Sequence, residues 1–409
     1  MTRPGSNHTM ILQAALLAIS ALGFGCGGAS TASNNSSSPP ITTSGNNVQP
    51  ITVNSGPANN YANGVFTSVT VCVPSSSTCQ TINEVLVDTG SYGLRLLSSA
   101  ANGALTLSLP AQNGANGNPV AECAPFVSTF TWGPLKTADV SVAGERASNV
   151  PVQVIDPTFS TIPAACQNSG LPANDTLATL GANGILGVGP FAQDCGTACV
   201  QTSAGNPGVY FECVSDSCQV TALPLTEQVQ NPVTLFATDN NGVILELPAA
   251  ANPAPSLSGS MVFGIGTQSN NGLGNAQVFL IDDSGNFSTT YKGQSYPAFI
   301  DSGSNAYFFL DSSTTGLPTC GDNSGFYCPS STTTVSATPS SGSPAPPITF
   351  SVGNADSLFS NPADAVFALL AGPNPGTFDW GLPFFFGRNV FTAIDGRSTP
   401  AGTGPFWAF

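Results

Sequence analysis

Two short motifs in this chain place a carboxylate, a hydroxyl, a glycine and a second hydroxyl in the same order. The first spans Asp88–Ser91 (Asp-Thr-Gly-Ser) and the second spans Asp301–Ser304 (Asp-Ser-Gly-Ser). Two carboxylates held close together in a cleft cannot both ionise, so they share one proton. Such a pair can supply a general base that activates a water molecule and a general acid that protonates a leaving group.

An apolar segment precedes each motif. Val85–Val87 and Ala298–Ile300 are typical of buried strands, and the motif that follows each of them predicts a tight turn. Gly90 and Gly303 would allow the turn and a close approach of the backbone. Two strand-and-turn units of the same composition suggest two related halves of the molecule that face one another.

The only histidine of the chain is His8, which lies in a segment that we interpret below as a signal peptide. The mature chain would therefore have none, which excludes Ser-His-Asp and Cys-His catalysis and every His-based metal site. A Ser-Lys dyad has only Lys136 and Lys292 to draw on. Carboxylates are the acid–base groups that remain for hydrolytic chemistry, which favours Asp88 and Asp301.

The composition indicates a mainly β protein with few charges. The chain of 409 residues has 44 Gly and 34 Pro, and its β-branched, apolar segments are separated by Gly, Pro, Asn and Ser. Lys and Arg number 7 against 22 acidic residues, a formal net charge of −15. Seven cations cannot build the basic face that phosphate backbones require, so we expect no nucleic-acid partner.

The double motif resembles that of the pepsin-like aspartic proteases, in which each lobe supplies one such turn and the two Asp side chains meet at a cleft. The resemblance implies a mainly β, bilobal fold with Asp88 and Asp301 as the catalytic pair. The ionised carboxylate would activate water, the protonated one would donate to the scissile carbonyl, and no acyl-enzyme would form. The chain also resembles a group of bacterial exported, Cys-containing proteins that carry this double motif.

The resemblance extends to residues that support the two turns. Thr89 and Ser302 match the pair whose hydroxyls link the two loops beneath the dyad. Ser91 and Ser304 can donate hydrogen bonds to the carboxylates and favour their ionised form. The segment 184–189 (Gly-Ile-Leu-Gly-Val-Gly) matches one that packs behind the first catalytic turn.

Two other segments depart from the pepsin-like pattern. Trp132 and Gly133 stand where a Tyr-Gly pair belongs to the flap that covers substrate; alternatively, Trp132 is a half-buried strand aromatic. Near the C-terminus, Pro383 and Phe384 stand where a Gly-Asp pair is usual, so the supporting motif of the second lobe is expected to be altered. The loop 282–286 is acidic and could bind calcium, but a hairpin turn is the favoured interpretation, and we expect no metal or cofactor.

The N-terminus predicts export. Residues 1–25 have a basic residue followed by an apolar stretch that suits a secretory signal peptide and is short for a membrane span. Small residues lead to Cys26, which resembles a bacterial lipobox. We expect lipid attachment there and an outer-membrane lipoprotein, facing the periplasm or the surface; the alternative is plain secretion. Membrane contact is expected only through this anchor.

The cysteines are typical of an oxidising compartment. There are 11, and setting Cys26 aside leaves ten. Short spacings favour the pairs Cys72–Cys79, Cys195–Cys199, Cys213–Cys218 and Cys320–Cys328, which leaves Cys123–Cys166. The spacing does not by itself determine connectivity, and it lacks the paired C-x-x-C pattern of a zinc site.

These observations predict an exported aspartic endopeptidase that acts on polypeptide as a monomer. The expected organisation is a flexible tether at 26–48, an N-terminal lobe at 49–250 with a Cys-rich surface insertion at 193–219, and a C-terminal lobe at 251–409. The alternative is a non-catalytic cell-surface binding or adhesion protein on the same scaffold. A glycosidase would hold its two carboxyl groups about 5–9.5 Å apart.

Overall fold

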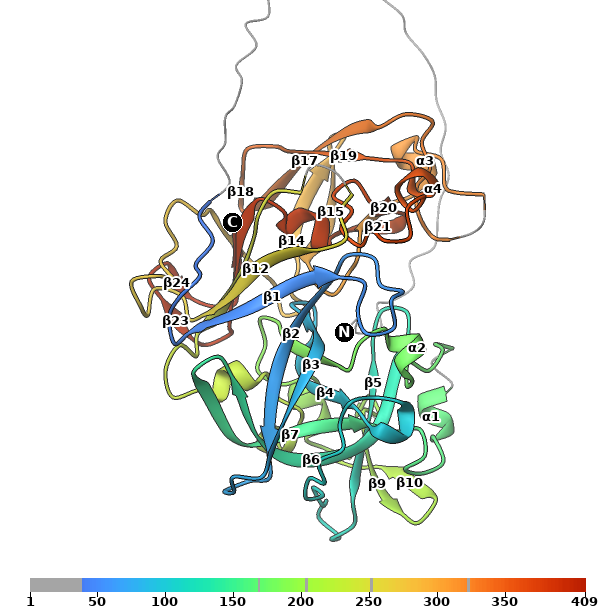
Figure 1. Ribbon diagram of the computed structural model, residues 1–409, viewed down its shortest axis with the longest axis vertical. Coiled ribbons are helices and arrows are strands. Elements are labelled where there is room, and N and C mark those ends of the chain that lie inside the picture. The colour runs from blue at the N-terminus through green and yellow to red at the C-terminus, as the bar shows by residue number, and fades with distance from the viewer. Residues whose placement is uncertain (1–38, 168–169, 203–204, 251–252, 322–323) are drawn as a thin grey trace, which may run out of the picture.

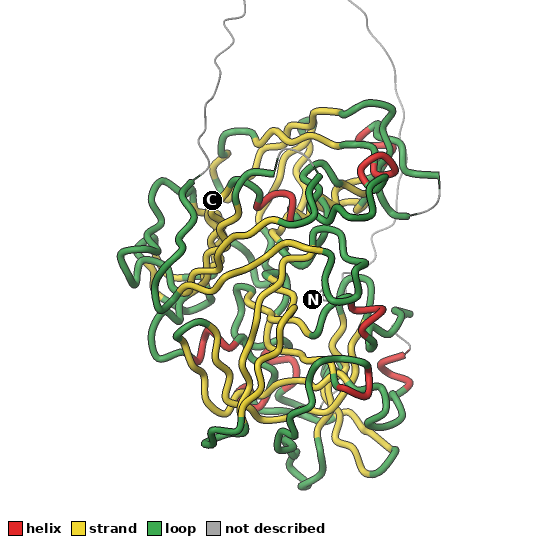
Figure 2. Tube along the Cα trace, viewed as in Figure 1, coloured by secondary structure: helices red, strands yellow, loops and turns green. Residues whose placement is uncertain are grey.

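The computed structural model describes residues 39–167, 170–202, 205–250, 253–321 and 324–409. Strands predominate (Figure 2), because frequent Gly and Pro interrupt any helical pattern. The α-helices of the described residues are single turns: α1 Ala164–Gln167, α2 Leu177–Leu180, α3 Ser312–Thr315 and α4 Ala355–Leu358. The 3-10 turns are η1 Ser99–Ala101, η2 Gly196–Cys199, η3 Leu225–Glu227, η4 Pro232–Leu235 and η5 Leu382–Phe385.

The larger sheet begins in the N-terminal half and continues through the middle of the molecule. Its order is β10-β9-β5-β6-β7-β4-β8-β3-β2-β1-β12-β11-β22-β25-β13. Its strands are β1 Val48–Asn54, β2 Gly64–Cys72, β3 Cys79–Asp88, β4 Tyr92–Leu97, β5 Val120–Pro125, β6 Phe130–Val142, β7 Glu145–Ile155, β8 Gly184–Val188, β9 Tyr210–Val214, β10 Ser217–Val220, β11 Gly242–Leu247, β12 Leu257–Phe263, β13 Val278–Leu280, β22 Arg388–Ala393 and β25 Phe406–Ala408.

A second sheet forms the other half of the molecule, in the order β18-β17-β14-β15-β21-β16-β20 with β19 paired to β17. Its strands are β14 Phe287–Tyr291, β15 Gln294–Ile300, β16 Tyr307–Leu310, β17 Thr333–Ser341, β18 Ser343–Pro344, β19 Ile348–Val352, β20 Ala371–Gly372 and β21 Asn374–Trp380, while β23 Ser398–Thr399 and β24 Gly402–Thr403 form a small hairpin. In Figure 1 the two halves lie below and above the paired strands β1 and β12, which cross between them. The boundary predicted at residue 250 falls between β11 and β12, which pair within the larger sheet.

The same strand arrangement occurs beside each Asp motif. In the first half, β8 lies between β3 and β4, parallel to β3 and antiparallel to β4. In the second half, β21 lies between β15 and β16, parallel to β15 and antiparallel to β16. Each turn that carries an Asp therefore connects two strands that are held apart by a third. This third strand sets the distance between the two strands that the turn connects. It thereby also sets the direction of the Asp side chain at the start of the turn.

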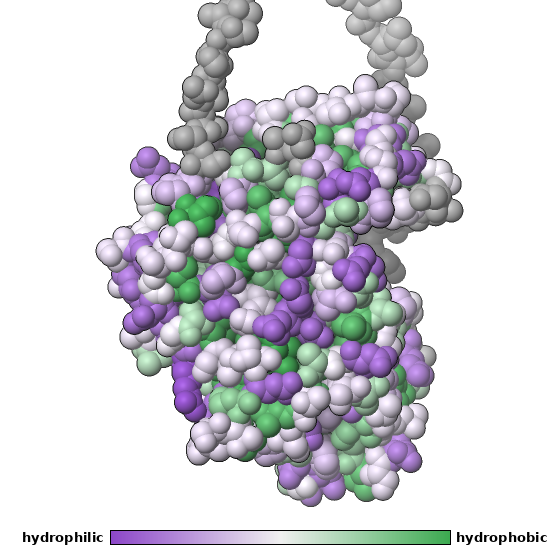
Figure 3. Space-filling model, in the orientation of Figure 1, coloured by the Kyte–Doolittle hydropathy of each residue, from purple (hydrophilic) through white to green (hydrophobic). Residues whose placement is uncertain are grey.

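A hydrophobic core joins the two halves beneath the turns. Val87 and Ile300, which directly precede the two Asp residues, are both fully buried and belong to the same cluster of packed side chains. Burial of apolar surface contributes most of the folding free energy, about 25 cal/mol per Å². The outer surface in view is mostly pale in hydropathy (Figure 3), which fits a chain with only 7% charged residues.

The expected flexible tether at 26–48 is ordered at its end. The backbone N–H of Thr42 donates to Glu246 at 2.5 Å, and the buried Asn47 side chain donates to the Phe263 carbonyl at 2.9 Å. The predicted signal peptide (1–25) and Cys26 lie outside the described residues. Within the described residues, no helix has both the length and the apolar character needed to span a membrane.

Disulfides join ten cysteines of the described chain in the four pairs that the short spacing favours, Cys72–Cys79, Cys195–Cys199, Cys213–Cys218 and Cys320–Cys328, and in the remaining pair Cys123–Cys166. Five disulfides are typical of an exported, non-cytoplasmic protein. The Cys-rich stretch at 193–219 is more than the surface insertion expected, because β9 pairs with β5 and its Tyr210 and Phe211 are buried.

Candidate active site

The turn after β3 holds the Asp88 carboxylate with two hydrogen bonds. The Gly90 N–H donates to Oδ1 at 2.8 Å, and the Ser91 hydroxyl donates to Oδ2 at 2.5 Å. Asp88 is 6% exposed, so these two donors replace most of its lost hydration. The hydroxyl and glycine of the motif therefore orient the carboxylate and compensate for its burial.

The turn after β15 repeats this arrangement around Asp301. The Gly303 N–H donates to Oδ1 at 2.7 Å, and the Ser304 hydroxyl lies 2.9 Å from Oδ2. Equal spacing in the two motifs thus produces equal geometry in the two halves of the molecule.

Thr89 and Ser302 connect the two turns, as the resemblance implies. The Ser302 N–H donates to the Thr89 hydroxyl at 2.9 Å, and the Thr89 N–H donates to the Ser302 hydroxyl at 3.0 Å. Each hydroxyl in turn donates across the interface, from Ser302 to the Val87 carbonyl at 2.8 Å and from Thr89 to the Ile300 carbonyl at 3.4 Å. Both residues are fully buried, so the four bonds lock the two strand ends together.

The two carboxyl groups face one another across the glycines. A methyl group on Gly90 would lie 2.6 Å from the Asp301 carboxyl carbon, and one on Gly303 would lie 2.7 Å from Asp88 Oδ1. Burial, the negative charge of Asp88 and a hydrogen bond with Asp88 raise the pKa of Asp301 to about 8. A proton is therefore held between the two carboxyl groups at neutral pH.

A glycine packs behind each turn, Gly187 on β8 and Gly381 directly after β21. A methyl group on Gly187 would lie 2.7 Å from the backbone of Ser91, and one on Gly381 would lie 2.7 Å from the carbonyl of Ser304. The supporting glycine of the second half is thus Gly381, directly after β21. The position expected for the altered supporting motif, Pro383 and Phe384, is therefore wrong, because these residues belong to the following turn η5.

A cavity of about 310 Å³ opens in front of the pair. Tyr61 and Tyr92 lie in its wall, and burial followed by the charges of Asp88 and Asp301 raises the pKa of both phenols. The other wall comes from the tip of the β5–β6 hairpin (124–129), together with Leu180 and Ile185. A larger, more open hollow of about 780 Å³ around Tyr296 holds neither carboxylate of the pair.

Trp132 and Gly133, which the sequence suggested as flap residues, do not line this cavity. Trp132 is fully buried and meets Phe211 edge to face, with ring centroids 5.7 Å apart. Gly133 allows β7 to pack closely, since a methyl group there would lie 1.9 Å from the Val154 carbonyl oxygen. Trp132 is thus a strand aromatic, and the hairpin tip before it covers the cavity instead. The flap interpretation is wrong because β6 continues through this point, and the alternative interpretation, a strand aromatic, holds with the ring fully instead of half buried.

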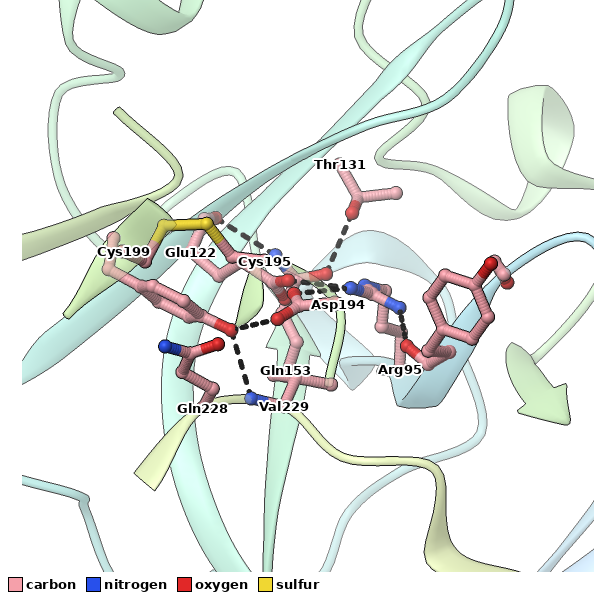
Figure 4. A network of polar contacts seen from close by, with 12 residues as sticks. Arg95, Glu122, Thr131, Gln153, Asp194, Cys195, Cys199, Gln228 and Val229 are labelled. Carbon is pink, nitrogen blue, oxygen red and sulfur yellow. Dashed lines mark hydrogen bonds and ion pairs between the residues drawn. A yellow bond between two sulfur atoms is a disulfide. The ribbon is translucent and has the colours of Figure 1, made fainter. Parts of the chain in front are cut away.

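A buried ionic network supports the β5–β6 hairpin (Figure 4). The sequence did not predict it. One guanidinium nitrogen of Arg95 lies 2.6 Å from Glu122 and 3.0 Å from Asp194, and all three side chains are at most 2% exposed. The Tyr210 hydroxyl donates to Asp194 and accepts from the Val229 N–H at 2.9 Å. Burial and the charge of Glu122 raise the pKa of Asp194.

Asp379 is a second functional candidate that sequence reasoning missed. It lies on β21, is 5% exposed, and its Oδ2 is 2.6 Å from the Ser304 hydroxyl. A signal was available, because this carboxylate interrupts an otherwise apolar run from Phe378 to Leu382. Its role depends on the partner brought to it by folding.

Solved structures that resemble the chain include an aspartic proteinase from Irpex lacteus. The TM-score is 0.51 at 16% sequence identity, with 88% of this chain and 96% of that chain covered. This similarity shows that the mainly β, bilobal fold is the pepsin-like fold that the double motif implied. None of the curated protein sequences matches the chain.

A family model described as "Protein of unknown function (DUF3443)" matches residues 43–409. The match covers both Asp motifs, the strands β8 and β21 that lie beside them, and the β5–β6 hairpin over the cavity. Because this match extends over most of the chain, the chain belongs to the DUF3443 family.

Proposed function

We propose that the protein is an aspartic endopeptidase that hydrolyses peptide bonds with a water molecule held between Asp88 and Asp301. The observation that carries this proposal is the reciprocal geometry of the two turns. Each carboxyl group is held by its own glycine N–H and serine hydroxyl and lies over the glycine of the other turn. The charge of Asp88 and a hydrogen bond with it raise the pKa of Asp301, as expected for a closely held pair, whereas the two carboxyl groups of glycosidases lie about 5–9.5 Å apart. This argues against the glycosidase alternative.

The proton distribution suggests which group starts in which role. Asp301, with a pKa of about 8, keeps its proton and donates it to the carbonyl oxygen of the scissile bond. Asp88 then takes a proton from the water, whose oxygen attacks the carbonyl carbon. The tetrahedral intermediate collapses when the leaving nitrogen receives a proton from Asp88, and Asp301 regains its own from the hydroxyl group of the intermediate.

A polypeptide substrate fits the cavity. Tyr61, Tyr92 and Phe126 give it an aromatic wall, while Val127 at the hairpin tip is 68% exposed and free to contact an entering chain. One chain supplies both carboxyl groups, so the proposal requires no second copy.

The test is hydrolysis of a peptide library at several acidic to neutral pH values. We expect cleavage that a statine-type inhibitor blocks and that Asp88→Asn or Asp301→Asn abolishes. Glu246→Gln is the matched control, since Glu246 is also a buried carboxyl group but lies on β11 beside Thr42. Cleavage that survives both Asp substitutions would exclude the pair. Inhibitor binding without any turnover would favour the non-catalytic binding protein.

We further infer that the protein is a lipoprotein of the bacterial outer membrane, anchored through Cys26. The small residues before this cysteine and the even number of cysteines that remain support the proposal. Labelling of cells with a radioactive fatty acid should mark the wild type, and Cys26→Ser should abolish the label. A labelled Cys26→Ser protein would contradict the proposal.

A further inference from the structure

Asp379 occupies a position that is apolar in the other half of the molecule. On β21 it pairs with Phe299, two residues before Asp301. The matching position on β8 is Ile185, which pairs with Leu86, two residues before Asp88. The two halves therefore differ by one buried carboxyl group behind the second turn.

The Ser304 hydroxyl lies between two carboxyl groups. Its oxygen is 2.9 Å from Asp301 Oδ2 and 2.6 Å from Asp379 Oδ2. The other oxygen of Asp379 is buried and has no hydrogen-bond partner among the described residues. In the first half, by contrast, the Ser91 hydroxyl contacts Asp88 at 2.5 Å.

Proton counting restricts the charge of this group of three. A hydroxyl has one hydrogen and can donate to only one of the two carboxyl groups. If Ser304 donates to Asp301, its oxygen must accept a hydrogen bond from a protonated Asp379. If Ser304 donates to Asp379 instead, Asp301 must carry the proton. At least one of the two carboxyl groups is therefore protonated whenever both contacts exist.

The surroundings of Asp379 favour its neutral form. Burial, then the charge of Asp301, raises its pKa well above the ordinary value, and Asp88 adds to this while the Ser304 hydrogen bond opposes it. On the other side, β16 contributes Phe308 opposite Asp379, while its neighbour Tyr307 pairs with Trp380. The ion pairs of the described residues involve Arg95 and Arg146, and none reaches Asp379.

We propose that Asp379 is a positioning residue that acts through Ser304 as a proton reserve for the Asp88–Asp301 pair. The Asp379 O–H bond breaks and its proton passes to the Ser304 oxygen, while the Ser304 proton passes to Asp301 Oδ2. Ser304 is neutral before and after, Asp379 becomes a carboxylate, and Asp301 becomes an acid. The pair thereby keeps its single proton to higher pH than two carboxyl groups alone would. This inference rests on the proposed peptidase function.

The first experiment compares the pH dependence of kcat/KM for the wild type and Asp379→Asn. Asparagine keeps the shape and can donate to Ser304, but it holds no transferable proton. We expect the alkaline limb to move to lower pH by about 1 unit, the size of shift that a nearby titratable carboxyl group causes, with the acidic limb in place. Asp379→Ile, the residue of the matching position, should give the same displacement. Glu246→Gln should leave the profile unchanged, and superimposable profiles for Asp379→Asn and the wild type would overturn the proposal.

A second experiment needs no activity, so it separates this inference from the peptidase proposal. A carboxyl group whose pKa is raised on folding contributes stability at low pH that is lost as pH rises towards its folded pKa. Denaturant unfolding from pH 4 to 8 should therefore show a shallower loss of stability in Asp379→Asn and in Asp301→Asn. Because Ser304 couples the two groups, their effects should be non-additive in the double variant. An unchanged slope in Asp379→Asn, or strict additivity, would overturn the proposal even if no peptide is cleaved.

Discussion

At the scale of single residues, the candidate site depends on two positions that must be glycine, because a side chain there would collide with the site. Gly90 and Gly303 leave the space in which the opposite carboxyl group lies. Their importance comes from contact with the other half of the chain, in addition to the turn they allow. The glycine of each motif therefore leaves room for the carboxyl group of the other motif.

This contact predicts the effect of one added methyl group. Gly90→Ala places a carbon atom 2.6 Å from the Asp301 carboxyl carbon, so one of the two must move. We expect kcat/KM to fall by about 10² or more, as for a misplacement of about 1 Å near reacting groups. Gly272→Ala is the control, since a methyl group there meets nothing within 4 Å. Full activity in Gly90→Ala would contradict the close approach.

At the scale of elements, the β5–β6 hairpin covers the cavity and the buried network holds the hairpin. Arg95 on β4 pairs with Glu122 on β5, donates to the Tyr92 carbonyl at 2.7 Å, and lies 5.6 Å from the centre of the Phe126 ring. One side chain thus connects the strand after the first turn to the tip of the hairpin. The network is part of the wall of the site.

Substitutions along the hairpin should separate its two functions. Phe126→Ala removes an aromatic ring from the cavity wall, and we expect kcat/KM for peptides to fall at least about tenfold. Trp132→Phe alters a ring buried against Phe211, so it should lower the free energy of unfolding by about 1–2 kcal/mol and leave kcat/KM nearly unchanged. Steady-state kinetics and denaturant unfolding on both variants check this. The opposite pattern would restore Trp132 as the flap residue.

The network itself should be costly to break. Arg95→Leu leaves Glu122 and Asp194 buried without their cation, and we expect a loss of about 3–5 kcal/mol in the free energy of unfolding. Arg146→Leu is the matched control, because the Arg146 side chain is 53% exposed and exposed pairs contribute about 1 kcal/mol or less. Equal losses in urea unfolding of the two variants would show that the buried network is not rigidly paired.

At the scale of the whole molecule, polar contacts far apart in sequence hold the two halves in register. Beyond the Thr89–Ser302 exchange, the fully buried Asn63 donates to the carbonyls of Asn305 at 2.8 Å and Phe367 at 3.0 Å. It also accepts from the Phe367 N–H at 2.7 Å. Asn63 has a positive φ of 52°, a conformation that asparagine tolerates better than most residues.

Removal of this contact tests how strongly it couples the halves. Asn63→Gly keeps the backbone conformation and deletes three hydrogen bonds, so we expect a loss of about 3 kcal/mol in unfolding free energy. Because Asn305 follows directly after the Ser304 that contacts Asp301, kcat/KM should also fall. Urea unfolding and peptide kinetics check both effects. Reduced stability with unchanged kinetics would show that the Asn63 contacts stabilise the fold without affecting the position of Asp88 and Asp301.

Much of the architecture could be predicted because its signals are local. The strands before Asp88 and Asp301, the turns at their ends and the short disulfide loops depend on residues that are neighbours in sequence. Repetition of one motif then implied two related halves. The sequence did not decide between the two interpretations of Trp132, because its local pattern is the same for a strand that folds over a cleft and for one that passes beside it.

The sequence by itself determined the chemistry that is available: two Asp motifs, no histidine beyond residue 8 and few cations. Tertiary structure alone decided which side chains join that chemistry. Tyr61, Phe126 and Asp379 reach the site from strands and loops far from either motif, through pairings that no local pattern specifies. Tyr61 and Asp379 are coupled to the pair electrostatically, and Phe126 contributes a ring to the cavity wall. These effects depend on separations of a few ångströms, which arise only when the chain packs into its tertiary structure.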